Sequence, residues 1–124
     1  MTVALWCVLI AALLPYLAAT LAKAGGSGYD NRDPRAWLQR QEGWRLRANN
    51  AQQNSFEAFP FFAAAVIVAQ MLQAPQERVD ALAVIFIAAR LAYLACYVAD
   101  WHWARSVAWL LGLMACVFLF ASGS

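Results

Sequence analysis

Four long apolar stretches limit what this chain of 124 residues can fold into. A transmembrane helix needs about 20 predominantly apolar residues to cross the hydrocarbon layer of a bilayer. Because lipid offers no hydrogen-bond partner to an open backbone, such stretches cross the membrane as helices. The sequence therefore predicts an all-α membrane protein with one domain over residues 1–124, a four-transmembrane-helix bundle with helices at about 3–22, 45–72, 78–100 and 103–121.

The composition agrees with a membrane protein. Hydrophobic residues make up 64% of the chain and charged residues 13%, whereas soluble domains carry about 45–50% and about 25%. The net charge is +2, and the basic residues gather in one loop, so we expect no nucleic-acid partner. Cys7, Cys96 and Cys116 lie far apart in apolar stretches, a pattern typical of small buried hydrophobes that predicts neither a disulfide framework nor a metal site.

The first apolar stretch has two interpretations. Ala22-Lys23-Ala24 resembles the cleavage site of a secretory signal peptide. No basic residue precedes the apolar run, however, and the run is long for a signal peptide. We therefore expect a retained membrane helix, with cleavage as the alternative.

The distribution of Lys and Arg predicts the orientation. Outside the spans, every basic residue except Arg78 lies in or beside the first and third connections. Short loops rich in Lys and Arg stay in the cytoplasm, so this side is predicted to be cytoplasmic and both termini to lie outside. Within the first connection, Asp33-Pro34 predicts the start of a short interfacial helix.

Polar side chains follow one face of each of the two middle spans. In the second span they are spaced 3, 4 and 3 residues apart, and the third span repeats this spacing, so each set forms one stripe along its helix. A single antiparallel register would align the two stripes completely. The predicted pairs are Arg47 with Asp100, Asn50 with Tyr97, Asn54 with Tyr93, and Glu57 with Arg90.

The deepest of these pairs is the strongest functional signal. Glu57 lies about 18 Å along its helix from Arg45, at about 1.5 Å per residue. An ionisable residue at that depth suggests a functional site, with its partner to be named, and we name Arg90. Removing a charge from water costs several kcal/mol of free energy before pairing with an opposite charge offsets this cost. This cost favours a ligand-lined pocket over hydrogen bonds that only hold helices together. The interpretation that these polar residues only hold the helices together by hydrogen bonds stays open.

Two further features belong to the same side of the predicted bundle. His102, the only histidine, lies in the turn between the last two spans, where a solvated side chain is expected rather than a catalytic one. Ser106 follows at the start of the last span and is expected to cap that helix.

Three stretches of the sequence resemble one known family. "RANNAQQNSFEAFPFFAAAVIVA" is similar to the second-helix signature of the MAPEG superfamily, the membrane-associated proteins of eicosanoid and glutathione metabolism. "RLAYLACY" resembles the third-helix pattern, and "ARSVAW" resembles the start of the fourth helix in the prostaglandin E synthase branch. The loop "YDNRDPR" looks like that of a bacterial branch, which implies a multi-pass protein of the bacterial inner membrane.

The resemblance implies a homotrimer of four-helix bundles, with glutathione as the co-substrate bound between neighbouring subunits near the cytoplasmic face. It also implies a lipophilic small-molecule substrate that enters from the lipid bilayer. Arg105 is the predicted catalytic residue, because a cation beside a thiol favours the thiolate. The predicted binding residues, from the polar stripes and the resemblance together, are Asn50, Asn54, Glu57, Arg90, Tyr93, Tyr97 and Ser106, with no metal ligand.

The chain departs from the family pattern at two positions. Several eicosanoid enzymes carry an arginine where this chain has Asn50, and Arg47, one turn earlier, is the candidate replacement. The prostaglandin branch carries a tyrosine where this chain has Trp109. The identity of the second substrate is therefore left open.

The sequence thus favours a membrane glutathione-dependent transferase or peroxidase that acts on lipophilic electrophiles. A member of the same family that binds or scaffolds without catalysis is the first alternative. A small multidrug exporter is the second, but such exporters carry a membrane carboxylate in their first helix, and the first span here has no charged residue.

Overall fold

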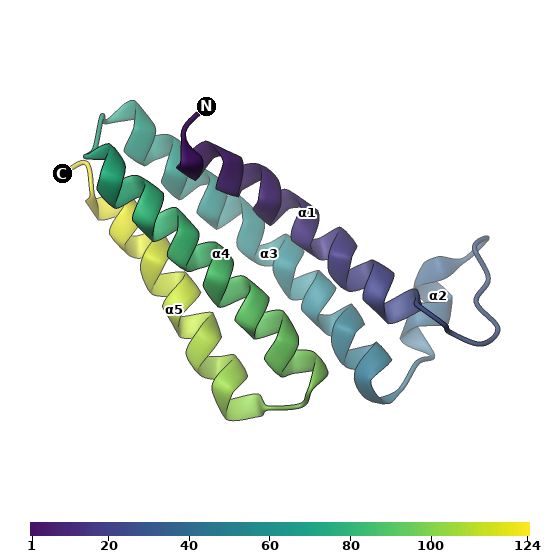
Figure 1. Ribbon diagram of the computed structural model, residues 1–124. Coiled ribbons are helices and arrows are strands. Elements are labelled where there is room, and N and C mark those ends of the chain that lie inside the picture. The colour runs from purple at the N-terminus through teal and green to yellow at the C-terminus, as the bar shows by residue number, and fades with distance from the viewer.

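The computed structural model describes all residues from Met1 to Ser124 and contains five helices (Figure 1). Four of them are long and apolar enough to cross a membrane, and the fifth is a short helix in the first connection. The predicted fold class, an all-α bundle of four membrane helices, is confirmed. The helices are α1 (Val3–Lys23), α2 (Pro34–Gln39), α3 (Gly43–Met71), α4 (Gln76–Val98) and α5 (His102–Ala121).

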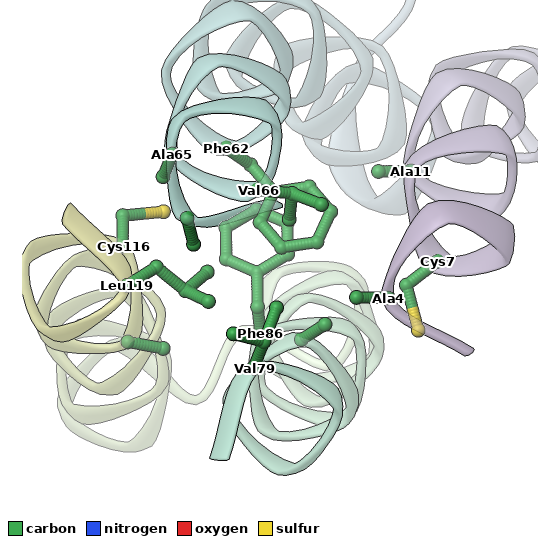
Figure 2. Close-up of a cluster of buried hydrophobic side chains, with 13 residues drawn as sticks. Ala4, Cys7, Ala11, Phe62, Ala65, Val66, Val79, Phe86, Cys116 and Leu119 are labelled. Carbon is green, nitrogen blue, oxygen red and sulfur yellow. The ribbon is translucent and has the colours of Figure 1, made fainter. Parts of the chain in front are cut away.

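Helices α3 and α4 form the middle of the bundle. α1 packs mainly on α3, and α5 packs mainly on α4, so α1 and α5 lie on opposite sides (Figure 2). Both chain termini lie at one end of the bundle, here called the terminal end, and α2 lies at the other, here called the loop end (Figure 1).

Small side chains bring α1 close to α3. The buried face of α1 carries Ala4, Ala11, Ala18 and Ala22 at heptad-like intervals. Without a hydrophobic driving force between helices in lipid, small residues of this kind stabilise association by allowing close backbone approach. The large side chains of α1 point outward, where lipid or another chain can cover them.

The main core lies between α3 and α4, toward the terminal end. The rings of Phe62 and Phe86 stack with centroids 3.9 Å apart and an interplanar angle of 4° (Figure 2). Val66, Val79 and Leu119 are fully buried around them. This stack fixes how α3 and α4 face each other, and so it fixes the position of the polar residues nearer the loop end.

Hydrogen bonds close the bundle at the terminal end. The Oδ1 atom of Asp80, on α4, accepts from the backbone N–H of Ala4 at 2.9 Å and from Gln76 Nε2 at 2.8 Å. The Oε1 atom of Gln70, at the end of α3, accepts from Thr2 Oγ1 at 3.2 Å. One polar cluster thus satisfies a free N–H of α1 and joins three helices.

Two arginines near the start of α3 bind the ends of neighbouring helices at the loop end. Arg45 Nη1 donates to the carbonyl of Ala22 at 3.0 Å. Arg47 donates from Nε and Nη2 to the carbonyl of Val98 at 3.2 and 3.0 Å. Cations at helix C-termini satisfy free carbonyls and interact favourably with the helix dipole.

Two of the predicted pairs between the polar stripes do not form within the subunit. Arg47 contacts Val98 instead of Asp100, and Arg90 donates to Ser55 instead of pairing with Glu57. Both observed partners are two positions earlier in the sequence than predicted. The chain's one ion pair joins Asp30 and Arg32 in the first connection, so neither predicted ion pair forms within the subunit.

The turn after α4 explains part of this difference. α4 ends at Val98, and Asp100 has a left-handed backbone with φ of 63°. The N–H of Trp101 donates back to the carbonyl of Cys96 at 2.8 Å, as in a Schellman motif. Asp100 has therefore already left the helical face on which the sequence pattern placed it.

We expect Asp100→Gly to leave the free energy of unfolding unchanged or to raise it by up to about 1 kcal/mol, because glycine adopts φ above zero without strain. Thermal unfolding of the detergent-purified protein measures the effect. The matched control is Ala99→Gly at the preceding right-handed position, where a loss of about 0.5–1 kcal/mol is expected. A clear loss of stability in Asp100→Gly would instead support the ion pair with Arg47.

Candidate functional site

Two adjoining cavities lie among α3, α4 and α5, and Asn54 and Trp109 line both. The polar cavity, of about 260 Å³, is nearer the loop end. The deep cavity, of about 270 Å³, is nearer the core. Besides the two shared residues, Tyr93, Tyr97, Arg105 and Ser106 line the polar cavity, and Glu57, Ala58, Phe61, Phe86, Arg90, Gly112, Leu113 and Cys116 line the deep cavity.

Two arginines and two tyrosines form a continuous row along the cavities. The guanidinium of Arg90 lies 4.2 Å from the ring centre of Tyr93, and that of Arg105 lies 4.4 Å from the ring centre of Tyr97. The two rings meet edge to face with centroids 5.6 Å apart. Cation–π contacts of this kind hold a guanidinium in place without neutralising its charge. The site therefore carries two fixed cations with no carboxylate paired to either.

Arg90 is the more deeply placed cation. Its side chain is 4% exposed, and its Nη2 donates to Ser55 Oγ at 3.2 Å across the α3–α4 interface. Charged residues are almost never this buried unless they are paired. With five N–H donors on the guanidinium, Arg90 keeps capacity to bind an anionic group in the deep cavity that it lines.

Asn54 lies where the two cavities meet. Its Oδ1 atom is the one buried side-chain nitrogen or oxygen in the chain without a hydrogen-bond partner. A buried acceptor left unpaired costs about 1–3 kcal/mol. A ligand with an N–H or O–H group at this junction would satisfy it, so Asn54 is the residue most directly prepared for a polar ligand.

Polarity decreases along the two cavities from the loop end toward the core. Tyr97 and Arg105 line the outer part, Asn54 the junction, and Phe61 and Phe86 the inner part. Each helix contributes one lining position about every turn, which keeps its contributing side chains on one face. The arrangement can therefore hold a polar, anionic molecule at the outer part and an apolar group at the inner part.

The cavities bring together every predicted site residue except Asn50. Asn50 is half-buried and lines neither cavity. Arg47, the candidate replacement for the family arginine, is held by the carbonyl of Val98 and also lines neither. Within one subunit, no cation takes the place of the arginine that Asn50 replaces.

Ser106 and Glu57 differ from their predicted contacts. Ser106 Oγ donates to the carbonyl of His102 at 3.1 Å, one turn back in α5, and no side chain caps the start of that helix. The expectation that Ser106 caps α5 is therefore wrong, although its side chain does line the polar cavity. Glu57 is exposed beside the deep cavity and makes no ion pair within the subunit.

Sequence reasoning missed Ser55 and the apolar part of the lining, which consists of Ala58, Phe61, Phe86, Trp109, Gly112, Leu113 and Cys116. Gly112 and Cys116 lie on the same face of α5 as Trp109, and that spacing was a usable signal. Ser55, the partner of Arg90, lies one position away from the polar stripe. Nothing in the local pattern marked it, because its role depends on how α3 and α4 are aligned.

The Ser55–Arg90 contact predicts a specific pattern of coupling in stability. We expect Ser55→Ala and Arg90→Met to show an interaction energy of about 0.6–1.5 kcal/mol in a double-mutant cycle, the range for one hydrogen bond between membrane helices. Glu57→Gln with Arg90→Met is the control cycle, and its effects should add within about 0.5 kcal/mol. Unfolding in detergent measures both cycles. A larger interaction energy in the Glu57–Arg90 cycle than in the Ser55–Arg90 cycle would support the pair predicted from the sequence.

The model of the MAPEG family matches residues 3–123, nearly the whole chain and all of the residues that line the two cavities. No curated protein matches the sequence.

Proposed function

Because this chain belongs to the MAPEG family, a family of membrane proteins with glutathione-related transferase and peroxidase chemistry, we propose that it is a glutathione-dependent transferase or peroxidase acting on lipophilic electrophiles. The observation that carries the proposal is the pair of unpaired guanidiniums, Arg90 and Arg105, beside the unsatisfied Asn54 Oδ1 atom.

The chemistry of glutathione matches this set of groups. The tripeptide carries two carboxylates, one ammonium group, amide N–H groups and a thiol. Arg90 can bind a carboxylate, and such charge-assisted hydrogen bonds are about twice as strong as neutral ones. The Asn54 Oδ1 atom can accept an amide N–H, and the exposed Glu57 carboxylate can bind the ammonium group. Tyr93, Tyr97 and Ser106 supply the remaining polar surface of the polar cavity.

Arg105 is the group proposed to activate the thiol. A free thiol has a pKa of about 8.5, and a neighbouring cation or helix N-terminus lowers it. Arg105 lies in the first turns of α5 and lines the polar cavity, so its positive charge acts there. The thiolate then attacks the electrophilic carbon, a sulfur–carbon bond forms, and the leaving group departs with the bonding electron pair.

The proposal includes the assembly and its setting. Both cavities open at the side of the bundle among α3, α4 and α5. A neighbouring subunit in a homotrimer can close that side, exclude water from bound glutathione and supply the positive charge that Asn50 lacks. We place the loop end in the cytoplasm of a bacterial cell, in its inner membrane, because glutathione would then reach the polar cavity from the basic side.

We expect detergent-purified protein to conjugate glutathione to chlorodinitrobenzene, with a pH–rate midpoint below about 8.5, the value for a free thiol. Arg105→Met should move the midpoint upward and lower the rate at pH 7 by about 10- to 100-fold, because the thiolate loses its cation. Arg105→Lys should restore part of the loss. The matched control is Arg78→Met, an exposed arginine at the terminal end, which should leave the rate unchanged.

Isothermal titration with glutathione separates the remaining outcomes. Saturable binding without turnover would remove the enzyme proposal and leave a binding or scaffold protein of the same family. Absence of glutathione binding would also contradict the assignment of the two cavities as the glutathione site. A rate that Arg105→Met does not change would retain the enzyme and reject the role given to Arg105.

A further inference from the structure

A separate cavity, here called the loop-end pocket, lies between the last turn of α1, α2 and the first half of α3, which meet at the loop end (Figure 1). Its volume is about 430 Å³, within the range of pockets that bind whole molecules. Asn49, Gln52 and Phe56 line it from α3. Helical spacing puts these three residues on the face of α3 turned away from Asn54 and Glu57. The loop-end pocket is therefore distinct from the polar and deep cavities.

The loop-end pocket carries a net positive charge. Lys23 and Arg35 line it, and no Asp or Glu does. The chain's one ion pair joins Asp30 and Arg32, so neither lining cation is neutralised by a carboxylate. The Lys23 Nζ atom lies 5.5 Å from the ring centre of Tyr29, a cation–π contact that holds the ammonium group and keeps its charge. Two unpaired cations on one pocket complement an anionic group.

Carboxamide side chains supply the rest of the polar surface of this pocket. They are Gln39 on α2 and Asn49, Gln52 and Gln53 on α3. Asn49 is only 6% exposed, and its amide takes part in none of the side-chain hydrogen bonds within the subunit. Buried polar groups in proteins are normally hydrogen-bonded, so Asn49 indicates a ligand with hydrogen-bonding groups of its own. Because a carboxamide both donates and accepts, the set suits an anion that also carries hydroxyl groups.

The deeper edge of the loop-end pocket is apolar. Phe56 lines it there and meets Tyr16 of α1 edge to face, with ring centroids 5.6 Å apart. Tyr16 and Leu9 precede Lys23 by 7 and 14 residues, which places all three on one face of α1. Both apolar side chains are exposed. An apolar strip therefore continues from the pocket toward the terminal end, and an amphipathic ligand fits the pocket and the strip together.

We propose that the loop-end pocket binds the headgroup of an anionic phospholipid. Its phosphate lies beside Lys23 and Arg35, the hydroxyl groups of a glycerol headgroup reach Asn49 and the other carboxamides, and one acyl chain follows the strip past Tyr16. Basic pockets between membrane helices bind headgroups of this kind. A zwitterionic headgroup fits less well, because the pocket has no carboxylate for its ammonium group. This proposal goes beyond the transferase and does not depend on it.

The test titrates detergent-purified protein with dioctanoyl phosphatidylglycerol and with dioctanoyl phosphatidylcholine, and native mass spectrometry counts the bound lipid. Wild-type protein should bind phosphatidylglycerol about 25-fold more tightly, since each Lys or Arg near an anionic lipid contributes about fivefold. Lys23→Gln combined with Arg35→Gln should remove most of this preference. The matched control is Arg32→Gln combined with Arg40→Gln, which removes two positive charges from the same connection outside the pocket and should keep the preference within about threefold.

A variant without a change of charge separates a built pocket from general attraction between a basic loop and an anionic lipid. Asn49→Leu should weaken phosphatidylglycerol binding by about fivefold, the loss of one hydrogen bond, and leave phosphatidylcholine binding unchanged. Thermal unfolding without lipid shows whether the variant is folded. If it is not, Gln52→Leu at the half-buried position one turn away takes its place, with the same expected loss.

The other possible occupants of the pocket give distinct results. Equal affinity of wild-type protein for the two lipids, or an unchanged preference in the Lys23 and Arg35 double variant, would overturn the proposal. Glycerol 3-phosphate bound as tightly as phosphatidylglycerol would show a site for a soluble anion instead of a lipid. A raised KM for glutathione in the same double variant, measured in phosphatidylcholine alone, would assign the pocket to the glutathione site of a neighbouring subunit and also overturn the proposal. If wild-type protein binds no glutathione, the transferase fails, and the lipid titrations still decide this proposal.

Discussion

The stack of Phe62 on Phe86 joins the two central helices, and the site depends on it. Arg90 lies one turn from Phe86 along α4, and Ala58 lies one turn from Phe62 along α3. Because helices are stiff and their side chains repeat every 3.6 residues, fixing one contact between α3 and α4 fixes the facing positions one and two turns away. The hydrophobic core toward the terminal end therefore places the polar residues toward the loop end.

Burying polar side chains between the helices costs free energy, and this cost is larger in a bundle that is surrounded by lipid. Arg90 is buried with one hydroxyl partner, and the Asn54 Oδ1 atom has none. Groups that only hold helices together are normally satisfied within the structure. Donors and acceptors that stay unmatched in the isolated chain support the proposed ligand site, and the same cost would favour a ligand that carries matching charge.

How far the site could be predicted depends on which residues are considered. Asn54, Tyr93 and Tyr97 were found because helical spacing puts them on one face, and the cavities contain them. Asn50 has the same spacing and yet lines neither cavity. Ser55 has the wrong spacing, yet it is the residue that Arg90 reaches. Periodicity identifies a face, but the packing of the helices decides which positions on it meet a ligand.

By itself, the sequence determined the four membrane helices and the polar faces of the middle two, because hydrophobicity and the 3.6-residue period are local properties of a chain. The tertiary structure decided the register between α3 and α4, the partner of Arg90 and the shape of the two cavities. These depend on contacts between residues far apart in the chain. The left-handed backbone at Asp100, for example, takes that residue off the helical face on which the sequence pattern placed it.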